Sequence, residues 1–156
     1  MNVDISSIFL IRRDHMDFKD PLGLVIRDLH LEIANYLTKL LAPVRLAPEQ
    51  HLLMALLLEK EGLSQNEIAN KLGKDKASVA RMIASLENKG YIHKVPSTQD
   101  RRSVNVFVTD EGRKLETTIN EVTIKLNEII ATGFSPAEYS ALTTLLTRVQ
   151  NNVSEA

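Results

Sequence analysis

The chain has 156 residues, of which 44% are hydrophobic and 25% are charged, a composition typical of a globular protein that excludes a largely disordered one. It contains no cysteine, which excludes disulfides, thiolate metal sites and cysteine nucleophiles and favours a cytoplasmic location. The formal net charge is −1, but the segment from Lys71 to Lys114 has ten basic and five acidic residues, so a net charge of +5 lies between acidic ends and favours a phosphate-bearing partner.

The N-terminal part is predicted to be an extension followed by one long helix. Residues 1–19 show no clear pattern, and their apolar run from Ile8 to Ile11 is too short for a signal peptide or a membrane span, so no membrane partner is expected. Asp20 as a cap and Pro21 in the first turn predict a helix that ends at Pro43. Its apolar residues are spaced to form one stripe: Leu22, Ile26, Leu29, Ile33, Tyr36 and Leu40.

Two further helices are predicted before residue 74. The first starts at Pro48 and is apolar on every side from Leu52 to Leu58, which predicts a helix buried all round. Ser64 and Glu67 then have the spacing of a capping box and start a short helix. Gly73 ends it.

A fourth helix and a hairpin follow. Asp75 caps the helix, which is predicted to run to about Lys89. Its inward face is predicted to hold Val79, Met82, Ile83 and Leu86. The apolar period then changes from helical to alternating in Ile92–Pro96 and Val104–Val108, which predicts a two-stranded wing.

Two helices are predicted at the C-terminal end. Thr109 to Glu111 starts a long one with near-heptad apolar spacing, which Gly133 interrupts. Ser135 and Pro136 start the last helix. Its apolar stripe consists of Leu142, Leu145, Leu146 and Val149.

This order of elements predicts a mainly α fold, a winged helix-turn-helix with additional N- and C-terminal dimerisation helices. We assign residues 47–109 to the DNA-binding domain and residues 20–46 and 110–156 to dimerisation, because a chain this short cannot cover those apolar stripes by itself. We therefore expect a homodimer.

The fourth helix has the chemistry of a recognition helix. Ala77 and Ala80 are small enough for the backbone to approach the major groove, and Ser78 and Arg81 can then reach base edges or phosphates. A surface ion pair of Arg81 is the competing interpretation.

The hairpin tip offers a second contact. Arg101 and Arg102 can enter a narrow minor groove, whose negative potential attracts a guanidinium group. Asp100 either fixes one of these arginines or only caps the turn. A solvated turn is the competing interpretation of the two arginines, and the order of the elements favours DNA contact.

These motifs together resemble the MarR family of bacterial regulators over about residues 20–152. In chain order they are Ser64 to Gly73, Lys76 to Arg81, Leu86 to Ile92, Asp100 to Arg102 and Val108 to Gly112. The resemblance implies a dimer with a winged DNA-binding lobe in each chain. The DNA-binding residues that we predict are Gln65, Lys76, Ala77, Ser78, Arg81, Asp100, Arg101 and Arg102. Among them the resemblance gives Asp100 the role of orienting Arg102 and makes Gln65 and Lys76 the weaker candidates.

The sequence therefore predicts a regulator of transcription that binds double-stranded DNA at a pseudo-palindromic operator as a homodimer, with repression as the expected sign. The resemblance further implies release from DNA by a small aromatic or phenolic effector, whose pocket the sequence does not identify. The open alternative is a winged-helix protein-interaction module without DNA readout.

The sequence offers no catalytic or metal site. It has no Ser-His-Asp order, phosphate-binding loop or metal motif, so we predict that the protein is not an enzyme. The four histidines, His15, His30, His51 and His93, have no paired ligand spacing. Of these, only His51 is singled out as a residue to examine for an effector pocket.

Overall fold

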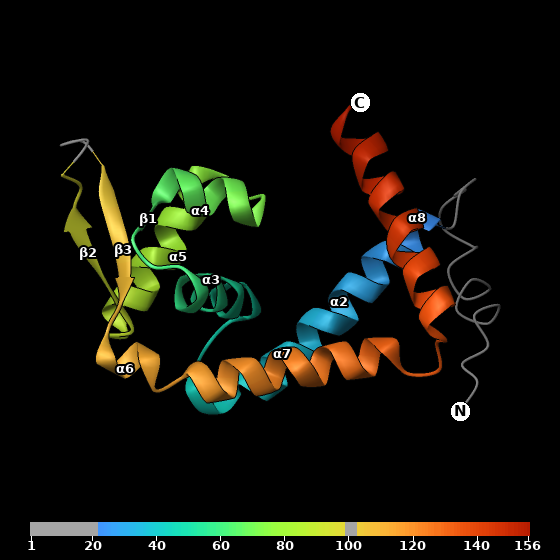
Figure 1. The fold of residues 1–156 in the computed structure, drawn as a ribbon, viewed down its shortest axis with the longest axis horizontal. Coiled ribbons are helices and arrows are strands. Elements are labelled where there is room, and N and C mark those ends of the chain that lie inside the picture. The colour runs from blue at the N-terminus through green and yellow to red at the C-terminus, as the bar shows by residue number, and fades with distance from the viewer. Residues whose placement is uncertain (1–21, 99–102) are drawn as a thin grey trace, which may run out of the picture. The chain divides into compact units, whose positions relative to one another are not determined.

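The computed structural model describes residues 22–98 and 103–156 (Figure 1). In chain order its elements are α2 (Leu22–Leu41), η1 (Ala42–Val44), α3 (Pro48–Glu59), β1 (Leu63–Ser64), α4 (Gln65–Leu72), α5 (Lys76–Asn88), β2 (Ile92–Pro96), β3 (Val104–Val108), α6 (Asp110–Arg113), α7 (Glu116–Ala131) and α8 (Pro136–Ser154). The predicted mainly α winged-helix fold is confirmed. The described residues divide into two compact units, with the boundary after residue 48.

The first unit contains α2 and the short 3-10 helix η1. Helix α2 ends at Leu41 and η1 contains Pro43, so the predicted end of the first helix is confirmed. The predicted start signals, Asp20 and Pro21, lie outside the described residues. The apolar stripe of α2 remains partly accessible, since Leu22 and Leu29 are exposed and the other members are half-buried.

Helix α3 lies in the core of the second unit. Leu53, Met54 and Leu57 are fully buried, but Leu52 is 50% exposed. The prediction that this helix is buried all round was therefore wrong. Its buried surface instead includes two polar residues, Gln50 and His51, whose side chains find hydrogen-bond partners on α5 and α7.

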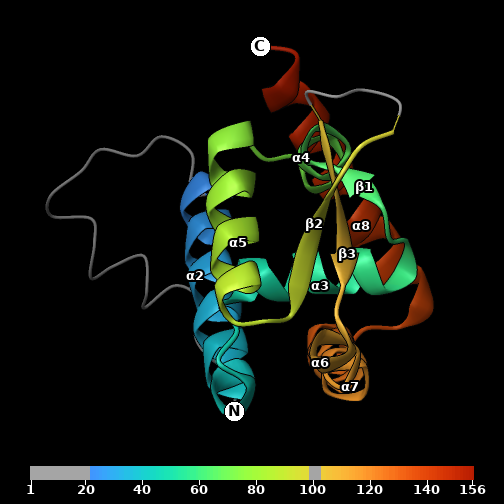
Figure 2. The ribbon, with the colours of Figure 1, turned by 90° about the vertical axis from the view of Figure 1, so that its left-hand side faces the viewer.

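The sheet has three antiparallel strands in the order β1-β3-β2, so the prediction of a two-stranded wing was incomplete (Figure 2). The short strand β1 pairs Leu63 with Val106 and Ser64 with Asn105. On the other edge, β2 pairs with β3 along its whole length, from Ile92 to Pro96. Strand β1 thus joins the hairpin to the segment that leads into α4.

The predicted long helix after the wing is two helices, α6 and α7. Thr109 caps α6, as its hydroxyl accepts a hydrogen bond from the Gly112 amide at 3.1 Å. Gly112 is buried, and a Cβ there would collide with the Tyr91 carbonyl oxygen and the Val108 side chain. This close approach seats α6 against the sheet and explains why a glycine stands in the first turn.

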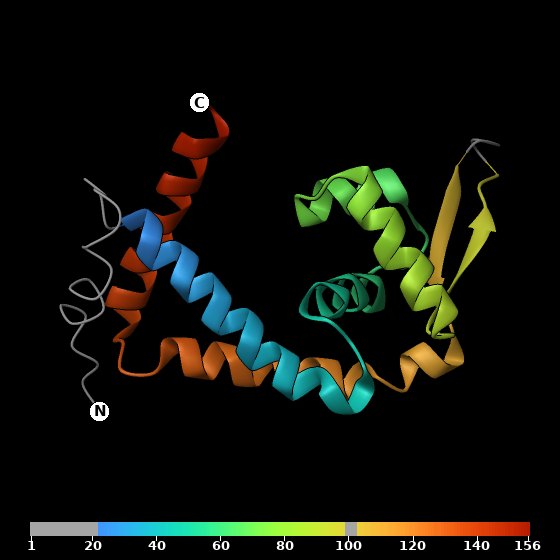
Figure 3. The same cartoon turned by 180° about the vertical axis from the view of Figure 1, so that it is seen from behind.

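A short connection joins the two C-terminal helices, α7 and α8 (Figure 3). Gly133 has φ +83° and separates α7 from α8. The predicted capping box of α8 is confirmed, with the Glu138 amide donating to the Ser135 hydroxyl at 3.3 Å. Only Ile119 and Val122 of α7 are buried, and α8 has no buried residue.

Candidate nucleic-acid interface

Helices α4 and α5 and the turn between them form the predicted helix-turn-helix. The capping box at the start of α4 is confirmed, since the Ser64 amide donates to the Glu67 carboxylate at 2.8 Å and the Glu67 amide donates to the Ser64 hydroxyl at 3.3 Å. Gly73 ends α4 in the left-handed region with φ +61°. Asp75 caps α5 two residues later.

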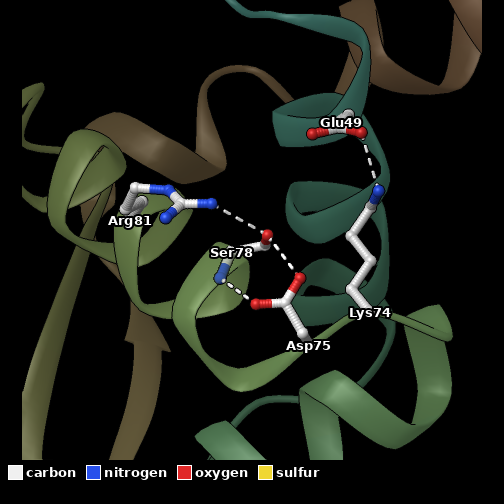
Figure 4. A network of polar contacts seen from close by, with 5 residues as sticks. All are labelled: Glu49, Lys74, Asp75, Ser78 and Arg81. Atoms are coloured by element: carbon white, nitrogen blue, oxygen red, sulfur yellow. Dashed lines mark hydrogen bonds and ion pairs between the residues drawn. The ribbon is translucent and has the colours of Figure 1, made fainter.

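Polar contacts with α3 hold the helix-turn-helix near both ends of α5. At the turn that precedes α5, the Lys74 ammonium lies 2.7 Å from the Glu49 carboxylate (Figure 4). Near the other end, the Gln50 amide donates to the Ser85 hydroxyl at 2.9 Å, and Lys89 donates to the Gln50 carbonyl oxygen at 2.7 Å. Burial lowers the pKa of Lys89. These contacts fix α5 on α3, so its outward face has a defined orientation.

Helix α5 has the two faces that the sequence predicts. The predicted inward residues are all buried: Val79, Met82, Ile83 and Leu86. On the other face Lys76, Ala77 and Arg81 are exposed, whereas Ser78 is half-buried. A helix of this kind presents small, polar and basic groups without an apolar patch, which suits a DNA groove better than a protein core.

Three side chains at the start of α5 form a network that we call the cap network: Asp75, Ser78 and Arg81 (Figure 4). The Asp75 carboxylate accepts from the Ser78 amide at 2.8 Å and from the Ser78 hydroxyl at 2.6 Å. The Arg81 guanidinium in turn donates to the Ser78 hydroxyl at 3.0 Å. The Ser78 hydroxyl and amide, together with the charge of Arg81, lower the pKa of Asp75.

The hairpin is tied to α5 and to α6. Lys94 of β2 forms an ion pair with Glu87 of α5 at 2.7 Å. At the base of the hairpin, Glu61 accepts hydrogen bonds from the Val108 amide at 3.0 Å and from Arg113 at 2.8 Å. These contacts hold the wing at a fixed place beside the recognition helix (Figure 2).

Known proteins that are similar in sequence and fold identify the family. The sequence model of the MarR family matches residues 46–104. The transcriptional regulator BilQ of Clostridioides difficile is 30% identical over 131 residues, which cover 81% of this chain and 88% of BilQ. The chain belongs to the MarR family.

Solved structures of MarR proteins have the same fold. A MarR transcriptional regulator from Methanosarcina mazei Go1 is 26% identical with a TM-score of 0.75, and the match covers 86% of this chain and 98% of that one. MepR of S. aureus, solved as a DNA complex, has a TM-score of 0.80 at 22% identity over 87% of this chain and 99% of MepR. The predicted class, a transcriptional regulator and not an enzyme, agrees with these relatives.

The structure brings together only some of the predicted DNA-binding residues of this MarR-family chain. Ser78 and Arg81 are hydrogen-bonded to each other, and Lys76 and Ala77 lie on the same helix. Gln65 is the first residue of α4, half-buried and outside the cap network. The wing-tip candidates, Asp100, Arg101 and Arg102, lie outside the described residues.

Sequence reasoning assigned Asp75 only to the helix cap and did not assign Lys94 to the site. The signal for Asp75 was present, because an acidic cap three residues before a serine can reach both the amide and the hydroxyl of that serine. The Lys94 pair with Glu87 joins residues on two different elements, which no local spacing in this MarR-family sequence indicates.

His51, the histidine singled out in the sequence, is buried. Its Nε2 lies 3.2 Å from the Ile119 carbonyl oxygen and 3.2 Å from the Thr123 hydroxyl, while the buried Nδ1 has no hydrogen-bond partner among the described residues. In the same described part of this MarR-family chain, no group of three or more His, Cys, Asp or Glu residues could hold a metal ion. Within residues 22–98 and 103–156, no helix combines the length and apolarity needed to cross a bilayer.

Proposed function

We propose that the protein binds a pseudo-palindromic operator in double-stranded DNA as a homodimer, with α5 of each chain in the major groove. The observation that carries this proposal is the outward face of α5, where Arg81 is exposed beside small residues and forms no ion pair among the described residues. A guanidinium group without a carboxylate partner keeps most of its donors for guanine O6 and N7 or for phosphate. MepR, which has this fold, is known in a DNA complex.

The start of α5 supports the same orientation. Lys76 is the first residue of α5 and Ala77 the second, and both are exposed. Free backbone N–H groups and the positive end of the helix dipole lie at this end and favour phosphate. The cap network adds a polar group, Ser78, one turn from Arg81. The end of α5 that would enter the groove therefore combines charge with little bulk.

The homodimer is supported by apolar side chains that the single chain leaves exposed. On α7 these include Ile124 and Ile129, and on α8 they include Leu145 and Leu146. A second copy that covers this surface generates a two-fold axis, which requires half-sites about one helical turn, or ~34 Å, apart.

The wing is proposed as the second DNA contact. Arg101 and Arg102 are proposed to enter the minor groove, with Asp100 orienting Arg102. The fixed base of the hairpin, held by Glu61 and Lys94, supports this role because it limits the positions that the tip can reach.

Repression and its relief by a small aromatic or phenolic effector are the regulatory part of the proposal. Their support is the family, and the buried His51 with its unpartnered Nδ1 is the residue that we would test first as an effector contact. Calorimetry with a panel of hydroxybenzoic acids, together with titration of the DNA complex, tests this part. If the acids produce no binding heat and release no DNA, control by this class of effector is rejected.

The main experiment is selection from random duplexes at two salt concentrations. We expect an enriched palindrome and an affinity that falls as salt rises, because phosphate contacts release counterions. Arg81→Ala should weaken specific binding by about tenfold to a hundredfold. The double variant Arg101→Ala, Arg102→Ala should weaken binding and reduce its dependence on salt.

Lys114→Ala is the matched control, because it removes one positive charge from the same basic segment at a side chain that is exposed and already paired with Glu111. Its affinity for the selected site should stay close to that of the wild type. If no sequence is enriched, or if binding is insensitive to salt, the chain would instead be a winged-helix protein-interaction module.

A further inference from the structure

The cap network constrains the single proton of the Ser78 hydroxyl. A serine hydroxyl has one proton to donate and two lone pairs that accept. In the structure the oxygen of Ser78 lies 2.6 Å from Asp75 Oδ2 and 3.0 Å from Arg81 Nη2 (Figure 4). Because a guanidinium group can only donate, Ser78 accepts from Arg81 and its proton points elsewhere.

The Ser78 hydroxyl donates its hydrogen bond to the Asp75 carboxylate. The hydrogen bonds from the Ser78 hydroxyl and amide and the nearby charge of Arg81 all favour the ionised carboxylate and lower the pKa of Asp75. An ionised carboxylate only accepts, so the Ser78 hydroxyl donates to it. What remains available on Ser78 for another molecule is lone-pair density.

From this geometry we infer that Asp75 is a positioning residue that makes Ser78 a pure acceptor, so that Ser78 selects the exocyclic amino group of adenine or cytosine in the major groove. Adenine N6 and cytosine N4 are the donors that bases present there, whereas guanine and thymine present O6 and O4 as acceptors at the corresponding places. Phosphate oxygens are also acceptors and are rejected for the same reason. This inference rests on the proposed DNA readout and goes beyond it by assigning a base class to one side chain.

Arg81 keeps its own role in this arrangement. Its hydrogen bond to Ser78 uses one of five N–H donors, which leaves the others for guanine or phosphate. The two neighbouring side chains then have opposite preferences: Arg81 seeks acceptors and Ser78 seeks donors. Asp75 sets this division without touching the DNA.

Asp75→Asn inverts the polarity of Ser78 while it keeps the helix cap. In the variant the amide oxygen must face the Ser78 amide, because the reverse orientation would bring two N–H donors together. The NH₂ group then replaces Oδ2 and donates to the Ser78 hydroxyl oxygen. The hydroxyl proton is released, and Ser78 becomes a donor that favours guanine or thymine. Asparagine caps helices about as well as aspartate, so the fold should be retained.

The test measures affinity for the selected operator and for a set of duplexes that each carry one substituted base pair. The proteins are the wild type, Asp75→Asn, Ser78→Ala and the double variant. The position that Ser78 reads is the one at which Ser78→Ala abolishes the preference of the wild type. There the wild type should favour adenine over purine, or cytosine over 2-pyrimidinone, by about two- to tenfold, the range of one hydrogen bond, because these analogues lack only the exocyclic amino group.

Asp75→Asn should reverse that preference, and the double variant should show none. A merely structural role for Asp75 would weaken binding to all duplexes equally and would leave the order of preference unchanged. Thermal unfolding of Asp75→Asn close to that of the wild type shows that the cap is intact.

Three results separate this inference from the proposed function. If the wild type selects an operator but Asp75→Asn keeps the wild-type base preference, the inference is wrong and DNA readout stands. Should Asp75→Asn unfold, wild-type binding that is not weakened by removal of the amino group at the position sensitive to Ser78→Ala overturns the inference, and weakened binding supports it. If the wild type selects no operator, both fall together.

Discussion

The segment from α3 to α6 buries most of its large apolar side chains, whereas the segment formed by α7 and α8 leaves most of its own exposed or half-buried. In the first, large side chains of α3, α4, α5 and the sheet are fully buried, among them Leu53, Ile68, Ile83 and Val106. In the second, α7 buries two residues and α8 buries none, although both helices carry apolar stripes. The first segment, together with the start of α7 that contacts His51, thus closes a core within one chain, whereas the rest of α7 and α8 present a surface that a second copy can cover.

Two leucines show the difference at the level of single residues. Leu53 on α3 is 0% exposed, and Leu145 on α8 is 53% exposed. Burial of a leucine stabilises a fold by about 1.5–3 kcal/mol. Leu53 therefore contributes to the folding of each chain, while Leu145 contributes fully only when a partner covers it.

The largest effect is expected from Leu53→Ala. Removal of a fully buried side chain leaves a cavity and should lower the free energy of unfolding by about 2–5 kcal/mol, measured by urea denaturation. The neighbouring Leu52 provides a matched control, because it lies on the same helix but is 50% exposed. Leu52→Ala should change stability by less than about 0.5 kcal/mol. Equal losses in the two variants would show that α3 is not packed as described.

Leu145→Asp should act on association instead of on the core. A carboxylate within an apolar interface is left without partners, so we expect the dimer dissociation constant to rise by about tenfold to a hundredfold in sedimentation equilibrium. Affinity for a palindrome should fall in parallel, while affinity for a half-site stays unchanged.

Thr144→Asp is the control for Leu145→Asp, because it adds the same charge on the opposite side of α8, away from the apolar stripe. It should leave the dimer intact. If both variants dissociate the dimer, the whole circumference of α8 is involved; if neither does, the exposed stripe serves another purpose and the dimer proposal loses its main support.

Much of the fold, and the recognition helix in particular, follows from local signals in the sequence. The caps of α4, α5 and α8 were predicted because Ser64, Asp75 and Ser135 bond to backbone groups only three residues away. The faces of α5 were predicted because a buried helix face leaves a period of about 3.6 residues. Such signals need no knowledge of the rest of the chain.

The errors arose where the deciding partner is distant in sequence or the element is short. Strand β1 has two residues, too few to show alternation, and it exists because β3 pairs with it some forty positions later. Gln50 and His51 are buried because Ser85 and Ile119 offer them partners. The apolar run from Leu52 to Leu58 does not reveal these partners, and it predicted that Leu52 is buried as well.

The smallest predicted effect concerns the ion pair of Glu61 with Arg113, whose charged groups lie 2.7 Å apart. Arg113 is the last residue of α6, just before α7 begins. The hydrogen bond from Arg113, followed by that from the Val108 amide, lowers the pKa of Glu61 below its ordinary value of 4.5. A carboxylate with a lowered pKa stabilises the fold above its unfolded pKa, and this contribution is lost as the pH falls through the lowered value.

Glu61→Gln keeps an oxygen for the Val108 amide but removes the charge. Because the Arg113 side chain is 51% exposed, we expect a loss of about 1 kcal/mol or less at pH 7, measured by urea denaturation. The difference from the wild type should disappear at an acidic pH below the lowered pKa, where Glu61 is protonated in both the folded and the unfolded chain. Glu59→Gln, at an exposed position at the end of α3, should change neither value. If the loss is the same at both pH values, Glu61 acts through its hydrogen bonds and not through its charge. The hydrogen bond from the Val108 amide would then hold the base of the wing, and the ion pair with Arg113 of α6 would not.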